Sequence, residues 1–134
     1  MTMQAAKPKE PVLVVEDTPD SREVLGTLLE SEGYRVAYAV DGRDALDQLE
    51  RGLRPCLIVL DVAMPRMNGI EFRRAQSADP RFSDIPVILY SAVHEITWLY
   101  PSLDLPIVRK PVDVDHILEM VERSRRRLEA TPPA

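Results

Sequence analysis

Short apolar runs alternate with amphipathic stretches along most of this chain, and that alternation limits the fold more than any other feature. The apolar runs predict five strands, at residues 11–15, 34–40, 56–60, 85–90 and 105–108. Between these runs, apolar residues recur at helical spacing, as at Val24, Leu25, Leu28 and Leu29. Strands that are apolar on both faces need helices on both sides. The sequence therefore predicts an α/β fold with a doubly wound, five-stranded parallel sheet.

The length of the chain, 134 residues, is that of one domain. A chain of this size can bury a core without disulfide or metal staples. Residues 1–10 have no hydrophobic period and predict a flexible tail, and residues 128–134 predict a second one. We therefore expect a single domain over residues 11–127.

Charge and composition argue against several classes of protein. The net charge of −5 argues against non-specific nucleic-acid binding, which needs a basic surface. We interpret the basic run at residues 123–127 as a solvated helix end. No apolar run approaches the roughly 18 residues of a membrane span, and residues 1–11 have no apolar targeting core. The single cysteine, Cys56, cannot form an internal disulfide, which fits a reducing compartment. We therefore expect a cytoplasmic protein that binds neither nucleic acid nor membrane directly.

Polar side chains follow four of the five predicted strands. Glu16 and Asp17 come after the first strand, Asp61 ends the third, Ser91 follows the fourth, and Lys110 follows the fifth. The carboxyl ends of parallel strands meet at one edge of a sheet, where such folds place their binding sites. The sequence therefore predicts that three carboxylates, a hydroxyl and an ammonium group converge there.

This set of groups indicates phosphoryl chemistry. Three carboxylates packed together repel one another, and Mg²⁺, which takes oxygen ligands, removes that repulsion. The ammonium and hydroxyl groups can bind phosphoryl oxygens. Asp61 is the best candidate nucleophile, since carboxylates form acyl phosphates and this one ends the most apolar strand. Each feature alone has an ordinary explanation, such as a helix cap, but their coincidence at one edge favours a site.

Four segments carry a resemblance to a known family: VLVVED at residues 12–17, LIVLDVAMPRMNGIE at 57–71, Ser91-Ala92 and Lys110-Pro111. With these segments the chain, over about residues 11–126, resembles the response-regulator receiver domain of two-component signalling. The resemblance implies a flavodoxin-like fold with strand order 2-1-3-4-5 and five helices. It also implies that Asp61 accepts the phosphoryl group and that Lys110 and Ser91 contact it. The implied magnesium ligands are Glu16, Asp17, Asp61 and the backbone carbonyl of Ala63.

The resemblance also implies partners. The phosphoryl donor would be a phosphohistidine of a sensor histidine kinase or of a histidine phosphotransfer protein. A conformational change would then signal to a downstream protein that the sequence does not identify. Receivers of this kind also form homodimers, so a homodimer is an open expectation here.

Two features depart from the family pattern. Ile107 stands where the family usually carries a Tyr or Phe that acts as a switch, and the stretch between Ser91 and Lys110 is short. We therefore expect the region of the fourth helix to be short or irregular.

Two alternative functions stay open. One is a receiver-like adaptor that acts without phosphorylation. The other is a phosphatase with an aspartyl-phosphate intermediate, which would need a second acid where Ala63 stands. The missing acid argues that the chain is not an enzyme acting on outside substrates.

Overall fold

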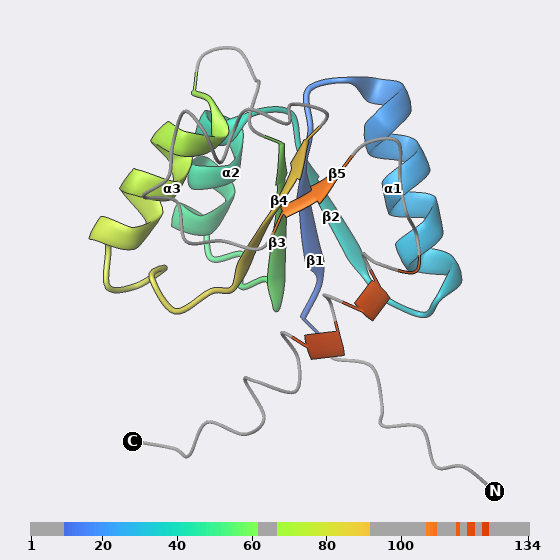
Figure 1. Cartoon of the computed structure of the whole chain (residues 1–134). Helices are drawn as coiled ribbons and strands as arrows, with labels where there is room; N and C mark the ends of the chain where they lie inside the picture. Colours follow the sequence, from blue (N-terminus) through green and yellow to red (C-terminus); the bar gives the residue numbers. More distant parts are fainter. Residues whose placement is uncertain are drawn as a thin grey trace, which may run out of the picture.

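The computed structural model describes residues 10–61, 67–91, 107–109, 115, 118, 119, 122 and 123, and of residues 90, 91 and 107–109 it describes the backbone alone. The described strands form one parallel sheet in the order β2-β1-β3-β4-β5 (Figure 1). They are β1 (Val12–Val15), β2 (Val36–Ala39), β3 (Leu57–Asp61), β4 (Val87–Ser91) and β5 (Ile107–Arg109). This order confirms the predicted doubly wound, flavodoxin-like sheet.

Three helices are described in full: α1 (Pro19–Ser31), α2 (Gly42–Glu50) and α3 (Gly69–Ala78). Helical residues are also described nearer the C-terminus, at positions 115, 118, 119, 122 and 123. The predicted short or irregular fourth helix lies outside the described residues. Residues 1–9 and 124–134, which include most of the first predicted tail and all of the second, lie outside them too.

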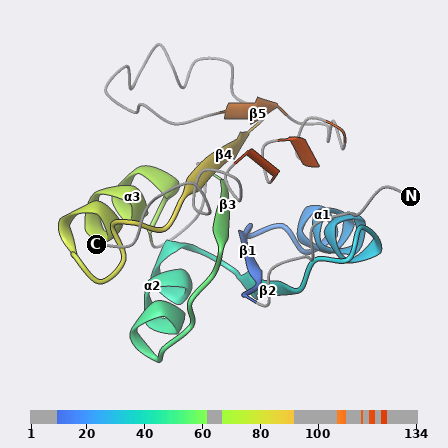
Figure 2. The same ribbon diagram turned by 90° about the horizontal axis from the view of Figure 1, so that it is seen from below.

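The helices cover both faces of the sheet. α1 lies against one face, and α2 and α3 lie against the other (Figures 1 and 2). Alternate residues of β1 enter different cores: Leu13 and Val15 pack on the α2 and α3 side, and Val12 and Val14 pack on the α1 side. All four are buried. This two-sided burial explains why the strand is apolar throughout rather than alternating with polar residues.

β2 and β4 each begin two residues later than the sequence predicts. The predicted strand at residues 34–40 begins at Val36, because the Tyr34 amide still donates to a carbonyl of α1 and Gly33 has the positive φ of a helix exit (+93°). The predicted strand at residues 85–90 begins at Val87, since the Ile85 amide is engaged in the preceding turn.

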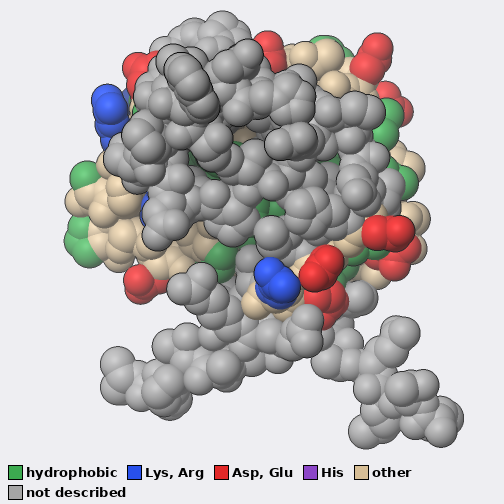
Figure 3. All heavy atoms as spheres, in the orientation of Figure 1, with side chains coloured by type: hydrophobic (Ala, Val, Ile, Leu, Met, Phe, Trp, Pro, Cys, Tyr) green, Lys and Arg blue, Asp and Glu red, His purple; other side chains and the backbone are tan. Residues whose placement is uncertain are grey.

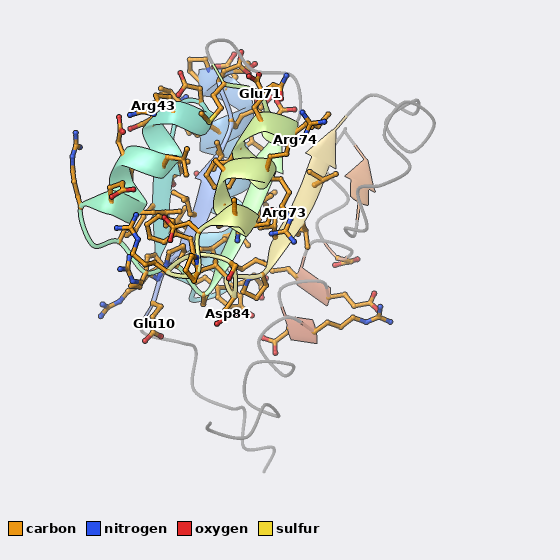
Figure 4. The ribbon with its side chains drawn as sticks, turned by 90° about the vertical axis from the view of Figure 1, so that its left-hand side faces the viewer. Glu10, Arg43, Glu71, Arg73, Arg74 and Asp84 are labelled. Atoms are coloured by element: carbon orange, nitrogen blue, oxygen red, sulfur yellow. The ribbon has the colours of Figure 1, made fainter. Side chains whose placement is uncertain are left out.

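The turn between α3 and β4 is held by a buried amide. Gln76 is fully buried, and its Nε2 donates to the carbonyls of Phe82 at 2.8 Å and Ile85 at 3.0 Å. Arg73, which projects from α3 in Figure 4, donates to the Oε1 of Gln76 at 2.7 Å. Both ends of the Gln76 amide are therefore bonded, as a buried polar group requires.

Arg81 fixes the same turn from outside. Its guanidinium lies 4.6 Å from the centre of the Phe82 ring and bonds the carboxylates of Asp79 and Glu50. The hydrogen bond from Arg81 holds the pKa of Asp79 below its usual value. The turn is thus linked to the end of α2.

β2 is an edge strand of the described sheet, and side chains of α2 bond two of the backbone groups along its outer side. The Nε2 of Gln48 donates to the Tyr38 carbonyl at 2.7 Å, and the Val40 amide donates to Asp44 at 3.0 Å. These polar groups of the edge are therefore bonded within the chain.

We predict that Gln76→Met lowers the free energy of unfolding by about 2–4 kcal/mol. The buried Phe82 carbonyl loses its donor, which costs about 1–3 kcal/mol, and the partly buried Ile85 carbonyl loses its donor at the low end of that range. Urea denaturation followed by circular dichroism measures this change. Ser77→Ala, at the exposed neighbouring position, is the matched control and should stay within about 0.5 kcal/mol of wild type. Equal stability of both variants would contradict the prediction.

Candidate functional site

Three carboxylates meet at the carboxyl edge of the sheet. One oxygen from each of Glu16, Asp17 and Asp61 lies within 4.8 Å of the others. The strand register explains their proximity, because Val15 of β1 pairs with Leu60 of β3. One step further along these parallel strands, Glu16 comes alongside Asp61.

The three acids differ in their exposure. Glu16 is fully buried and Asp61 is 5% exposed, whereas Asp17 is half-buried. A buried carboxylate is costly without compensating partners or charges. The least solvated acids are therefore the two that β1 and β3 place side by side.

Hydrogen bonds fix the backbone and side chain of Glu16. Its amide donates to the Ala39 carbonyl at 3.1 Å, and its Oε1 accepts from the Thr18 amide at 3.1 Å. The Nη1 of Arg22 donates to the Glu16 carbonyl at 2.9 Å. The acid is thus oriented by β2 on one side and by the start of α1 on the other.

The donor set fits a hard divalent cation. All three groups offer carboxylate oxygens, the ligands that Mg²⁺ and Ca²⁺ take. Two ligands on opposite sides of Mg²⁺ are about 4.2 Å apart, given bonds of about 2.1 Å. Separations within 4.8 Å are close to that value, so small side-chain adjustments or one bridging water would complete the geometry.

The other predicted site residues are less fully described. Tyr90 pairs with Asp61, so the backbone of Ser91 lies one step beyond Asp61 on the neighbouring strand. Ser91 in turn pairs with Arg109, the residue before Lys110. The side chain of Ser91 is not described, and Lys110 and Ala63 lie outside the described residues. Their predicted roles stay predictions.

Ile107, at the predicted switch position, begins β5, and its backbone pairs with Leu89 of β4. Its side chain is not described. The structure therefore places this residue in the sheet and leaves its predicted role untested.

Residues 62–66 lie outside the described residues. The next two residues, Met67 and Asn68, both make hydrogen bonds to neighbouring segments. Asn68 caps α3, with its side chain accepting from the amides of Ile70 and Glu71, and Glu71 bonds back to the Asn68 amide. The Met67 carbonyl accepts from the Gly42 amide at 3.0 Å. A Cβ at Gly42 would lie 2.7 Å from that oxygen, so this contact requires glycine.

Two supporting contacts were missed from the sequence. Arg22 bonds the Glu16 carbonyl at the site, and the Gly42 amide bonds the Met67 carbonyl after residues 62–66. Every residue type offers a carbonyl, so no sequence motif marks either contact. The only available signal was indirect: Gly42 follows Asp41 in a turn-like pair, and Arg22 lies one turn into a predicted helix.

The comparisons with known proteins decide the family. The protein-family model of the response regulator receiver domain matches residues 12–122 of this chain. The chain belongs to this family. Among relatives, sporulation initiation phosphotransferase F of Bacillus subtilis is 33% identical over 118 residues, which cover 85% of this chain and 92% of that protein. The receiver is thus similar in sequence to a protein of comparable length.

Solved structures show the same relationship. The signal receiver domain of a histidine kinase from Syntrophus aciditrophicus has a TM-score of 0.82 and 30% identity, covering 93% of this chain and 96% of that one. A sensor histidine kinase receiver domain from Pseudomonas aeruginosa, with a magnesium ion coordinated in its active site cleft, has a TM-score of 0.79 and 25% identity, covering 87% and 98%.

The receiver spans only part of several relatives. It covers 52%, 61%, 54% and 52% of the length of the first four curated relatives it matches.

Among the described residues, no helix has the length and hydrophobicity to cross a membrane. On the face that Figure 3 shows, described acidic side chains lie at several separate places, and a basic side chain at the lower end lies beside acidic ones.

We predict that Asp17→Asn stabilises the metal-free protein by about 1–3 kcal/mol, because unit charges about 5 Å apart repel by that amount at effective dielectric constants of about 20–80. Urea denaturation in EDTA measures the gain. In Mg²⁺ the wild type should gain more stability than the variant, since the variant lacks one anionic ligand.

Asp20→Asn is the matched control for this prediction. Asp20 is exposed in the first turn of α1 and lies outside the group of three acids. Its replacement should cost up to about 0.5 kcal/mol through the helix dipole. If Asp17→Asn destabilises the protein in EDTA as much as Asp20→Asn does, mutual repulsion is not the controlling term.

Proposed function

We propose that this receiver accepts a phosphoryl group on Asp61 from a phosphohistidine of a sensor histidine kinase or a histidine phosphotransfer protein. The reaction depends on Mg²⁺, and the phosphorylated form signals by a conformational change. The convergence of Glu16, Asp17 and Asp61 at the end of β1 and β3 is the observation that carries this proposal.

The chemistry needs little beyond positioning and charge stabilisation. A carboxylate oxygen of Asp61 bonds to phosphorus while the bond from phosphorus to the imidazole nitrogen of the donor breaks, and that nitrogen keeps the electron pair. β3 is buried along its whole length, which holds Asp61 in place and limits the entropy lost in reaching an in-line geometry.

The acids prepare the site for the incoming phosphoryl group. Glu16, Asp17, Asp61 and the carbonyl of Ala63 hold the cation. Bound Mg²⁺ offsets the charge of the carboxylates and of the phosphoryl oxygens. The magnesium ion in the similar Pseudomonas aeruginosa receiver supports this choice of metal. Lys110 and Ser91 contact the phosphoryl oxygens, and Ile107 leaves the signal to be passed on without an aromatic switch.

We also propose the bounds of the domain, its compartment and its partners. The receiver domain spans residues 11–127 and works in the cytoplasm, where sensor kinases present their phosphohistidine. It signals to a downstream protein and does not turn over outside substrates. It has no direct contact with nucleic acid or membrane.

Two other functions make different predictions. A receiver-like adaptor would take no phosphoryl group at all. An aspartyl-phosphate phosphatase would hydrolyse a generic aryl phosphate, for which Ala63 offers no acid–base side chain.

We predict that incubation with acetyl phosphate and Mg²⁺ gives one phosphoryl adduct by intact mass spectrometry. The adduct should be lost in Asp61→Asn, because the amide nitrogen and oxygen are poor nucleophiles, and in EDTA, because the charge of the site is then uncompensated. The wild type should also give no steady turnover of an aryl phosphate.

Asp84→Asn is the matched control, since Asp84 is an exposed acid of the turn before β4 (Figure 4). This variant should form the adduct like the wild type. An adduct that persists in Asp61→Asn would place the acceptor elsewhere, and a wild type without an adduct would favour the adaptor.

A further inference from the structure

Arg22 connects the first helix to the loop that carries two of the acids. It is the fourth residue of α1, and its backbone amide donates to the Thr18 carbonyl at 3.0 Å. Its side chain turns back toward β1, where the Nη1 donates to the carbonyl of Glu16 at 2.9 Å. One residue therefore spans the whole segment from the end of β1 to the first turn of the helix.

Other hydrogen bonds of Glu16 also constrain this loop. Thr18 is the N-cap of α1, but its side chain makes no capping hydrogen bond. The Thr18 amide instead donates to the carboxylate of Glu16 at 3.1 Å. The bond from Arg22 fixes the carbonyl of the same residue. The Arg22 guanidinium thus orients the peptide between Glu16 and Asp17 by donating to its carbonyl oxygen.

Two effects of Arg22 on a bound cation oppose each other. Its positive charge repels Mg²⁺, but the side chain is partly exposed, so water weakens that repulsion. A hydrogen bond with a charged donor is worth more than a neutral one, and here it restricts a loop with two prospective ligands. The orienting effect should therefore exceed the repulsion.

We propose that Arg22 is a positioning residue for the cation site, and that it raises the affinity for Mg²⁺ by holding the Glu16–Asp17 peptide in its binding orientation. This inference rests on the proposed function, because it assumes that these acids hold Mg²⁺. Arg22 contacts neither the cation nor the phosphoryl group in this role.

The test is a Mg²⁺ titration of the whole chain by isothermal titration calorimetry. Arg22→Met keeps most of the side-chain stem and removes the donor, and Arg22→Gln is too short to reach the carbonyl. Both residues favour helices, so α1 is retained. We expect the dissociation constant for Mg²⁺ to rise roughly five- to tenfold in both variants. This is less than the full value of one charge-assisted hydrogen bond, because removing the positive charge of Arg22 also removes its repulsion of the cation. Arg22→Lys keeps a charged donor and should recover part of the loss.

Arg43→Met is the matched control. Arg43 is an exposed arginine of α2, 3.4 Å from Asp47 and outside the site (Figure 4). This variant should bind Mg²⁺ like the wild type. A second measurement, hydrogen exchange of the Thr18 amide, should be faster in Arg22→Met, since the loop that carries its acceptor is freed.

The outcomes separate this inference from the proposed function. If the wild type binds Mg²⁺ and the Arg22 variants bind it equally well, the inference is wrong and the proposed site stands. Tighter binding by Arg22→Met would show that repulsion dominates, which also overturns it. If neither Arg22→Met nor Arg22→Gln folds, Arg22→Lys decides: binding weaker than that of the wild type supports the inference, and equal binding overturns it. A wild type that does not bind Mg²⁺ would remove both proposals.

Discussion

The parallel pairing of β1 with β3 is the constraint on which the rest of this structure depends. It buries four consecutive residues of β1 and all five of β3. The same pairing ends by placing Glu16 and Asp61 side by side. The apolar contacts of the two strands stabilise an arrangement that the charges alone would oppose. The core therefore holds the three acids together against their mutual repulsion.

Much of this arrangement was predictable because it depends on local patterns. Continuous apolar runs identify buried parallel strands, and acids directly after such runs must lie at the carboxyl edge. Strand starts were less predictable. Tyr34 is hydrophobic and alternates with its neighbours like a strand residue, yet it belongs to the exit turn of α1, where its buried ring packs into the core and its hydroxyl bonds Glu122. A contact between positions so far apart leaves no local pattern.

The supporting contacts of the site were not predictable for a similar reason. Arg22 and Gly42 bond backbone carbonyls, and any residue type offers a carbonyl. The side chain of Arg22 alone suggests a solvated helix face, and Gly42 alone suggests a turn. Which carbonyl each of these residues bonds becomes clear only from the three-dimensional structure, where α1 lies beside the end of β1 and Gly42 lies beside Met67. The positions of the three acids thus follow from sequence pattern, whereas the contacts around them follow from tertiary structure.

The occupied edge of β2 restricts how two copies of this chain can associate. Joining two sheets through their edges requires outward-facing amides and carbonyls that can accept a strand from another molecule. At β2 the Tyr38 carbonyl is already bonded to Gln48, and the next outward amide is bonded to Asp44. A continuous intermolecular sheet at this edge would have to break both bonds. Association of two copies through this edge, including fibril growth from β2, is therefore disfavoured.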